Sequence, residues 1–436
     1  MRPQAVEPAA AHLDTPQQPD TKQSEPLSRV DDPDVATGHR SRTAADAGND
    51  YAAAPHAAGL LARHQSHRGR GAAEAGERLK TFYCTNCGFI VFFENVSCGN
   101  CGAVLGFEPT AMEMGAFAAD GDGTWHRLDS GKPDATARKW RQCRNYLQEQ
   151  VCNWMVPAEV TEERCLSCRH TEHSAALDEP ANKPAWFRLE TAKRRLFYSL
   201  YRLGLPVEAD RTHPAPAFRF LGSDGATATT GHLGGTVTLD IAEADAACRE
   251  SRRQQFGEAY RTLLGHFRHE IGHYYWDRLI RHGGRLATFR KLFGDDRRDY
   301  AEASQAYYAN PPTNWADSHI SAYATMHPWE DWAETWAHYL HISDALDTAK
   351  HWGFALHSDQ SADSPADVPE VTTNDQPFRQ VLLEQWLPLS QFLNSMGRSL
   401  GHGDVYPFVI PNPVLDKLVY VHHVIEEAAG HATREP

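Results

Sequence analysis

Residues 260–275 read YRTLLGHFRHEIGHYY, and this stretch decides how the rest of the chain is interpreted. Its apolar residues recur at helical spacing, and the pattern extends to a long helix predicted over residues 243–282. Inside it, His269, Glu270 and His273 stand in the order His-Glu-x-x-His. One helical turn separates the two imidazoles, so they face the same side and can share a metal ion. Glu270 is then placed to take a proton from a water on the open side of that ion.

A third metal ligand is expected downstream, on a helix predicted over residues 328–342. Glu330, Glu334 and His338 share one face of this helix, beside a face that carries three tryptophans. The spacing alone does not choose between Glu330 and Glu334, and a solvated acidic stripe is the alternative interpretation. The remaining candidates for the third ligand are His338, His319 and Asp317.

Eight of the nine cysteines fall between residues 84 and 168, in two groups of four. Three pairs have the spacing Cys-x-x-Cys, where random placement would give about 0.2 such pairs. The first group contains two of these pairs and predicts a structural zinc ion held by Cys84, Cys87, Cys98 and Cys101.

The second group contains one such pair and predicts a second structural zinc ion. Its expected ligands are Cys143, Cys152, Cys165 and Cys168. His170 or His173 could replace one of these cysteines, and a reduced cluster without metal is the alternative. The ninth cysteine, Cys248, is expected to be a small packed residue.

Composition and charge restrict the possible partners. Hydrophobic residues make up 41% and charged residues 23% of the chain, which is ordinary for a globular protein. The formal net charge of −14 disfavours nucleic acid as the main partner and gives no attraction to an anionic membrane. No apolar run approaches the roughly 18 residues of a membrane span, and the first residues lack the apolar block of a secretory signal. We therefore expect a cytoplasmic protein with reduced thiols.

The predicted fold class is α+β, with N-terminal zinc-ribbon modules of four cysteines each, followed by a helix-dominated domain. Residues 1–76 are poor in large apolar side chains and are predicted to be a disordered extension. The remaining predicted parts are a zinc-ribbon region at 77–175, a helix-dominated domain at 185–427 and a tail at 428–436.

Three further elements are predicted inside the helix-dominated domain. Residues 231–241 are typical of a turn followed by a short β-strand. Residues 358–377 are rich in Ser, Asp and Pro and predict a surface loop, and a last amphipathic helix follows at residues 378–393. His266, one turn before His269, is expected to be a partly buried histidine rather than a member of the site.

Residues 80 to 425 resemble the bacterial zinc-binding metallopeptidases that carry an N-terminal zinc ribbon. The stretches that carry the resemblance are residues 152–154, 241–245, 260–270 and 327–341. The combination of His-Glu-x-x-His with Glu-x-x-x-Glu is similar to the gluzincin metallopeptidases. Tyr323, seven residues before Glu330, is similar to the catalytic tyrosine of the anthrax lethal factor peptidase group.

The resemblance implies a zincin-like fold and a zinc-dependent hydrolase that cleaves peptide bonds. It implies that His269, His273 and Glu330 hold one catalytic zinc ion and that Glu270 is the general base. Tyr323 would donate a hydrogen bond to the developing oxyanion.

The resemblance also implies supporting roles around this centre. Glu334 would lie behind the ligands and orient an imidazole. The strand at residues 236–241 would bind an extended peptide along its edge. The expected partners are therefore a peptide or protein substrate and a protein that docks on the zinc ribbon.

Two other functions fit part of the pattern. One is a zinc-ribbon adaptor whose peptidase-like domain has no turnover, although the intact set of expected ligands, base and tyrosine argues against it. The other is a DNA-linked protease of the SprT type, which also joins His-Glu-x-x-His to a ribbon. In that group, however, the ribbon follows the protease and the third ligand is a histidine, and the acidic charge here disfavours DNA.

Overall fold

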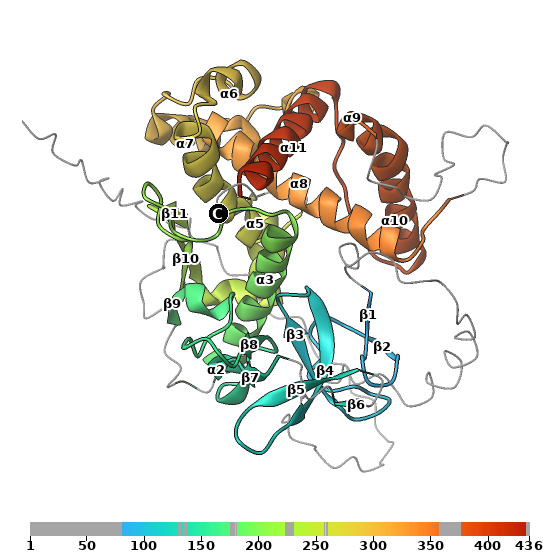
Figure 1. Ribbon diagram of the computed structural model, residues 1–436. Helices are drawn as coiled ribbons and strands as arrows, with labels where there is room; N and C mark the ends of the chain where they lie inside the picture. Colours follow the sequence, from blue (N-terminus) through green and yellow to red (C-terminus); the bar gives the residue numbers. More distant parts are fainter. Residues whose placement is uncertain are drawn as a thin grey trace, which may run out of the picture. The chain divides into compact units, whose positions relative to one another are not determined.

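The computed structural model describes residues 81–129, 132–133, 138–174, 179, 181–222, 231–256, 258, 260–356 and 376–432. The extension predicted at residues 1–76 lies outside these residues, as do residues 358–375 of the predicted loop and residues 433–436 of the predicted tail. The described residues belong to one compact unit that spans Glu74–Pro436. Short strands fill its N-terminal part and helices dominate its C-terminal part (Figure 1), which confirms the predicted α+β class.

The cysteine-rich region is built on two sheets. The first pairs β1 (Phe82–Tyr83) with β2 (Ile90–Val91), and Cys84 and Cys87 lie in the turn between them. The second has the order β3-β4-β5-β7-β8, with all ladders antiparallel and with β6 paired to β5. Its strands are β3 (Val104–Glu108), β4 (Glu113–Ala119), β5 (Trp125–Asp129), β6 (Lys132–Pro133), β7 (Trp140–Gln142) and β8 (Met155–Pro157), and the short helix α2 (Arg144–Leu147) follows β7.

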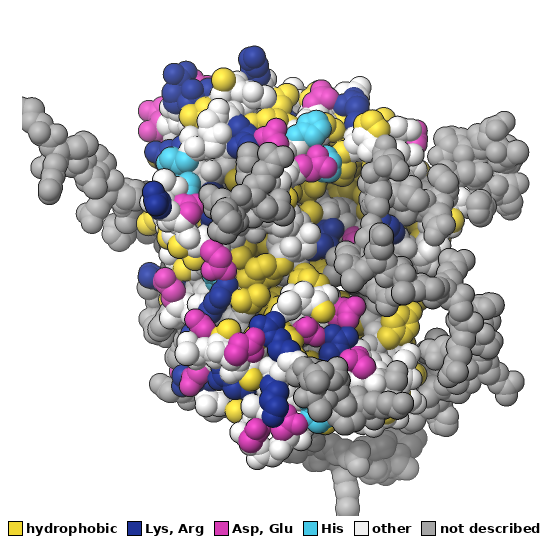
Figure 2. All heavy atoms as spheres, in the orientation of Figure 1, with side chains coloured by type: hydrophobic (Ala, Val, Ile, Leu, Met, Phe, Trp, Pro, Cys, Tyr) yellow, Lys and Arg dark blue, Asp and Glu magenta, His cyan; other side chains and the backbone are white. Residues whose placement is uncertain are grey.

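Ion pairs cover the surface of this region. Figure 2 shows acidic and basic side chains interspersed over its visible face. Arg127 on β5, for example, lies 2.5 Å from Glu108 and 2.8 Å from Glu113 on the two preceding strands. Opposite charges placed in this way compensate one another locally, as expected for a solvated sheet face.

A third sheet lies beside the central helices and has the order β11-β12-β10-β9. Its strands are β9 (Thr171–Ser174), β10 (Ala217–Leu221), β11 (Gly231–Leu233) and β12 (Thr236–Asp240). β10 is parallel to both β9 and β12, whereas β11 is antiparallel to β12. Gly234 and Gly235, with φ of 57° and 92°, make the tight turn of the β11–β12 hairpin. Because β9 directly follows the last cysteine pair, this sheet joins the cysteine-rich region to the helical part.

The β12 strand confirms the predicted turn and strand at residues 231–241, but its expected free edge is wrong. β12 lies between β11 and β10, and residues 236–238 are paired on both sides, so this part of the strand has no free edge for a peptide. The sheet edge next to α5 is β11 instead.

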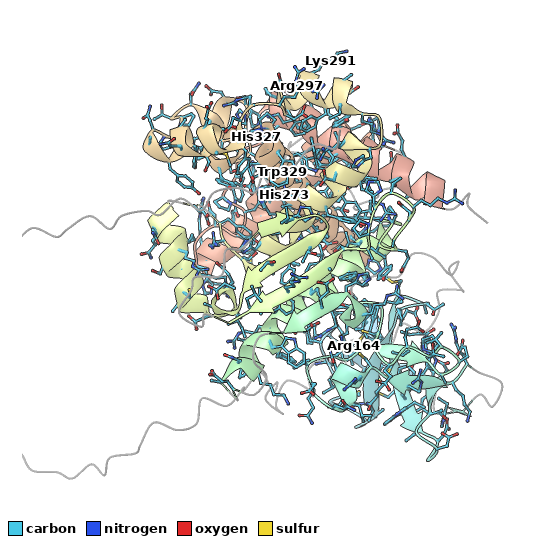
Figure 3. All side chains as sticks on the ribbon, turned by 90° about the vertical axis from the view of Figure 1, so that its left-hand side faces the viewer. Arg164, His273, Lys291, Arg297, His327 and Trp329 are labelled. Carbon is cyan, nitrogen blue, oxygen red and sulfur yellow. The ribbon has the colours of Figure 1, made fainter. Side chains whose placement is uncertain are left out.

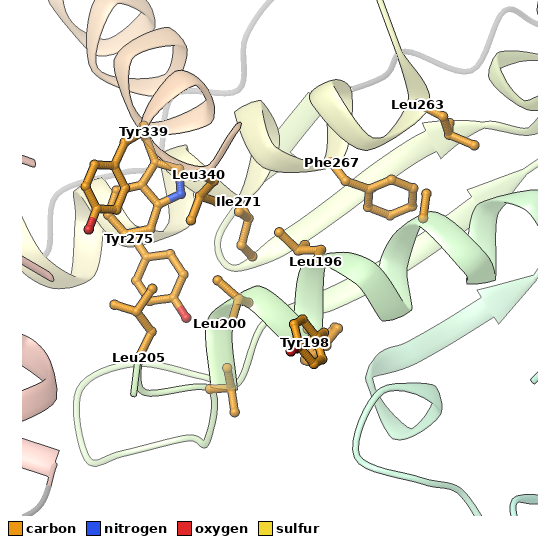
Figure 4. Close-up of a cluster of buried hydrophobic side chains, with 14 of the residues drawn as sticks. Leu196, Tyr198, Leu200, Leu205, Leu263, Phe267, Ile271, Tyr275, Tyr339 and Leu340 are labelled. Carbon is orange, nitrogen blue, oxygen red and sulfur yellow. The ribbon is translucent and has the colours of Figure 1, made fainter. Parts of the chain in front are cut away.

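Three long helices form the centre of the helical part. α3 (Asn182–Arg202) packs against α5 (Leu263–Tyr275), and α5 packs against α8 (Pro328–His351). Figure 4 shows the shared core, in which Leu196 and Leu200 of α3 face Phe267 and Ile271 of α5. Gly272 allows α5 and α8 to approach each other closely, because a Cβ at this position would lie only 3.1 Å from the backbone of Ala333. The indole of Trp332 also donates a hydrogen bond of 2.9 Å to the carbonyl of Gly272.

The single long helix predicted over residues 243–282 is wrong. The structure contains a short 3-10 turn η2 (Ile241–Ala244), α4 (Ala246–Phe256), α5 and the π-helical segment η3 (Trp276–Arg281). The new start at α5 has a local cause, because Thr262 is extended and its hydroxyl accepts a hydrogen bond of 3.0 Å from the amide of Gly265.

The helix predicted over residues 328–342 is present and continues to His351 as α8. Residues 378–393 are helical as predicted, divided among α9 (Phe378–Val381), η6 (Leu382–Trp386) and α10 (Leu387–Ser399). The other helical elements are η1 (Cys168–His170), α6 (Leu286–Phe293), α7 (Tyr300–Ala309), η4 (Trp315–Asp317), η5 (Tyr323–Thr325) and α11 (Asn412–Ala432). Within the part of the chain that the structure describes, none of these helices is both long and apolar enough for a membrane span.

Candidate metal site and cleft

The side chains of His269, His273 and Glu330 converge between α5 and α8. Each offers one ligand atom, and the three atoms lie within 4.8 Å of one another. The Nε2 atoms of the two histidines are 3.2 Å apart, and Glu330 Oε2 lies 3.0 Å from that of His269 and 3.5 Å from that of His273. These separations suit three ligands around one tetrahedral ion with bonds of about 2.0–2.2 Å.

The chemistry of the three side chains fits zinc. Glu330 Oε2 is buried and has no hydrogen-bond partner, so a bound cation would satisfy it. Burial raises the pKa of Glu330, but His273 and His269 outweigh burial and hold this pKa well below the usual range. The carboxylate is therefore ionised, and two imidazoles with one carboxylate are a ligand set that zinc accepts.

Local structure fixes the positions of these ligands. Pro328 begins α8 and His327 caps it, with its Nδ1 accepting a hydrogen bond of 3.1 Å from the amide of Trp329. The indole of Trp329 stacks on the ring of His273 with centroids 3.6 Å apart, and Figure 3 shows these residues together above the sheet. The ring of His273 is therefore held in place, while Glu330 lies in the first turn of the same helix.

Glu334 lies behind His269, on the side away from the other two ligands. His269 Nδ1 donates to Glu334 Oε1 at 2.7 Å, and Ser321 donates to the second oxygen of Glu334 at 2.7 Å. The bond to Nδ1 leaves the Nε2 lone pair of His269 facing His273 and Glu330. The other candidates for the third ligand, His338, His319 and Asp317, are not members of this group.

Two tyrosines lie next to the three converging side chains. The ring of Tyr323, in η5, is centred 6.0 Å from that of His269. The hydroxyl of Tyr300, at the start of α7, donates a hydrogen bond of 2.8 Å to Glu330 Oε1. Sequence reasoning missed Tyr300, because no motif relates it to Glu330, thirty residues away.

Replacing Tyr300 tests whether this hydrogen bond supports the metal site. Tyr300→Phe should bind zinc at this site about 10-fold more weakly, because the partner that orients Glu330 is lost. Titration with a competing chelator measures the affinity. Tyr308→Phe is the matched control on the same helix, since Tyr308 is 60% exposed. Equal zinc affinities of the two variants would refute the role of Tyr300.

A cavity of about 520 Å³ adjoins these residues. Its walls come from α5, α7, η5, α8 and the segment before α11. Glu270 and Tyr323 both line it, next to His269. Burial raises the pKa of Glu270, but the hydrogen bond from His266 and the nearby imidazoles outweigh it, so this pKa is lowered. An ionised, buried carboxylate therefore faces a space large enough for part of a peptide.

The structure brings together the four cysteines of each predicted group. In the first, the sulfur atoms of Cys84 and Cys101 are 3.7 Å apart, as are those of Cys87 and Cys98. In the second, the sulfur atoms of Cys152 and Cys165 are also 3.7 Å apart. Four thiolates at about 2.3 Å from one zinc ion have such separations. The complete groups are Cys84, Cys87, Cys98 and Cys101, and Cys143, Cys152, Cys165 and Cys168.

The second cysteine group is buried against α3. All four of its cysteines are buried, whereas Cys87 and Cys101 of the first group are exposed. Arg194 of α3 lies beside it, where burial lowers the pKa of the guanidinium but the charges of Cys152 and Cys168 outweigh burial and raise it. His170 is not part of the group, which consists of the four cysteines; its Nδ1 hydrogen-bonds the carbonyl of Pro216 at 2.7 Å. The side chain of His173 lies outside the described residues.

Comparison with known proteins agrees with this arrangement. Residues 182–424 match the family described as "Putative zinc-binding metallo-peptidase", and residues 81–179 match a zinc-ribbon domain. Uncharacterized proteins of Mycobacterium tuberculosis and Mycobacterium bovis are 43% identical over 356 residues, which cover 80% of this chain and 96% of each relative. No solved structure matches the chain. The resemblance inferred from the sequence is thereby confirmed, and the chain belongs to the "Putative zinc-binding metallo-peptidase" family, with a zinc-ribbon domain ahead of the peptidase region.

Proposed function

We propose that this protein is a zinc-dependent peptidase that hydrolyses peptide bonds, with its catalytic zinc held by His269, His273 and Glu330. One observation carries the proposal: two imidazole nitrogens and an unpartnered buried carboxylate oxygen converge, and one of these side chains, His269, lines a cavity together with Glu270. When bound, zinc lowers the pKa of a water molecule and polarises a carbonyl group.

The protein's own residues then carry out the proton transfers and stabilise charge. Glu270 takes a proton from the attacking water and delivers it to the leaving amine as the peptide bond breaks. Tyr323, which lines the same cavity, donates a hydrogen bond to the developing oxyanion. Glu334 holds His269 in the tautomer and orientation that binding requires.

The substrate main chain is proposed to lie along β11. This strand is the edge of its sheet and packs beside α5, and the ring of His232 on β11 lies 6.2 Å from that of His273. An extended peptide can pair with such an edge through main-chain hydrogen bonds, which make few demands on its sequence.

The proposed domains and structural zinc sites are as follows. The two cysteine groups hold one structural zinc each within a zinc-ribbon region at residues 77–175, and the peptidase domain spans residues 185–427. The separate family matches to residues 81–179 and 182–424 support this division. The ribbon is the proposed docking surface for a partner protein.

The test is a peptide-library cleavage assay on wild type and on Glu270→Gln, each with its zinc content measured. The variant should keep its zinc and lose about 10²- to 10⁴-fold in kcat/KM, because the general base is gone. Glu302→Gln is the matched control, since Glu302 is exposed on α7. Full activity of Glu270→Gln, or activity that survives complete removal of zinc, would overturn the proposal. A wild type that cleaves no peptide would favour the adaptor function instead.

A further inference from the structure

His266 lies one turn before His269 on α5, and its imidazole stands between two carboxylates. Its Nε2 is 3.4 Å from Glu270 Oε1, and its Nδ1 is 3.7 Å from Glu243 Oε2 in η2. The side chain of His266 is 16% exposed and lines the same cavity as Glu270. One imidazole therefore bridges the proposed general base and a carboxylate on another element.

Between His266 and Glu243, a possible donor and an acceptor face each other without a hydrogen bond. His266 Nδ1 and Glu243 Oε2 are both buried and both lack a hydrogen-bond partner. Because they face each other at 3.7 Å, a shift of a few tenths of an ångström closes a hydrogen bond that satisfies both.

Glu243 itself is firmly held. Its side chain is only 1% exposed, and its Oε1 pairs with Arg252 and, at 2.9 Å, with Arg261. Two guanidinium groups on one oxygen leave the other oxygen directed at His266. The chain of contacts therefore runs from fixed arginines through Glu243 and His266 to Glu270.

The charge of His266 is consistent with a donor on both ring nitrogens. Burial lowers the pKa of this imidazole, but the nearby carboxylates of Glu243 and Glu270 outweigh burial and raise it. A protonated imidazole donates through both nitrogens, which matches an acceptor on each side.

We propose that His266 is a positioning residue that holds the carboxylate of Glu270 through Nε2, while Glu243 anchors the imidazole through Nδ1. The contact engages one carboxylate oxygen of Glu270 and leaves the other for the attacking water. Fixing this orientation before the reaction removes the cost of arranging the base in each turnover. The inference rests on the proposed function for the role of Glu270, whereas the bridge between the two carboxylates stands on the geometry alone.

The alternative, a merely structural role, suits this arrangement poorly. The bridge places two carboxylates, an imidazole and two guanidinium groups in one largely buried cluster. Apolar side chains in place of the whole cluster would avoid the cost of desolvating such charges. The cluster is explained if the carboxylate of Glu270 needs a hydrogen-bond donor in a fixed position.

The test compares His266→Leu with His266→Gln in the full-length zinc-loaded protein. Leucine fills much of the space without a donor, whereas the glutamine amide can still donate to Glu270. His266→Leu should lower kcat about 10- to 100-fold with KM and zinc content unchanged, and His266→Gln should recover most of that loss. Equal activity of His266→Leu and wild type, or an equal loss in both variants, would overturn the positioning role.

A spectroscopic measurement keeps the test independent of peptide cleavage. Cobalt(II) in place of zinc gives visible absorption bands that respond to the groups around the metal-bound water. The spectrum of cobalt-loaded His266→Leu should move towards that of Glu270→Gln, while His266→Gln should stay close to wild type. If wild type cleaves no peptide but the spectra follow this order, the proposed function fails and the positioning role stands. A His266→Leu spectrum identical to that of wild type overturns the positioning role.

Discussion

Cys165→Ser is expected to remove one of the three zinc ions proposed for the chain and to lower the melting temperature by about 10 °C or more. Cys165 belongs to the cysteine group that is buried against α3, beside Arg194. Without the ion the remaining buried cysteines take up protons, so the guanidinium of Arg194 loses the negative charge beside it. Since α3 packs directly on α5, the damage reaches the helix that carries His269 and His273. Native mass spectrometry counts the ions, and thermal unfolding followed by circular dichroism gives the melting temperature.

Cys87→Ser is the matched comparison in the first cysteine group. Cys87 is exposed and lies between the short strands β1 and β2. This variant should also lose one zinc ion, but its melting temperature should fall by only a few degrees, because less buried structure depends on that ion. Cys248→Ser, outside both groups, should match wild type in both measurements. A wild-type count of one zinc ion, or equal destabilisation by Cys165→Ser and Cys87→Ser, would contradict this assignment.

The cysteine groups and the His-Glu-x-x-His turn were predictable from sequence because their geometry is local. A Cys-x-x-Cys turn and one turn of helix fix the relative positions of their side chains within a few residues. Spacing also reduced the candidates for the third ligand to Glu330, Glu334 and His338 on one helix, with His319 and Asp317 before it. The choice between Glu330 and Glu334 needed the packing of α8 on α5, which no local pattern contains.

The predictions that the structure contradicts failed for physical reasons as well. Apolar periodicity continues through residues 256–264, so it concealed the break at Thr262, where a side-chain cap starts a new helix. In the third sheet, β12 pairs with β10, although β11 and the segment before it separate the two strands in the sequence. The residue pattern of β12 alone therefore cannot show that it has a neighbour on both sides. Tyr300 reaches Glu330 because the start of α7 lies against the start of α8, where its ring also contacts His327 and Trp329.

Glu330→Ala is expected to lose the catalytic zinc outright, while Glu334→Ala should bind it about 10- to 100-fold more weakly. The two carboxylates contact opposite nitrogens of one imidazole: Glu330 Oε2 lies 3.0 Å from His269 Nε2, and Glu334 Oε1 lies 2.7 Å from His269 Nδ1. The two ring nitrogens point in different directions, so an ion bound at Nε2 can be shared with Glu330 and not with Glu334. Native mass spectrometry and competition with a chelator distinguish an empty site from a weakened one.

The amide variants separate loss of charge from loss of a hydrogen bond. Glu334→Gln has one acceptor oxygen where the carboxylate offers two, one to His269 and one to Ser321, so it should retain only part of the wild-type affinity. Glu330→Gln keeps the shape of the ligand but removes the negative charge that two imidazoles already favour in the folded protein, so it should bind zinc nearly as poorly as Glu330→Ala. The structural zinc ions should remain in all four variants, because four thiolates bind zinc more tightly than two imidazoles and a carboxylate. A Glu334→Ala protein with an empty site, beside a Glu330→Ala protein with a full one, would reverse the assignment of ligand and supporting residue.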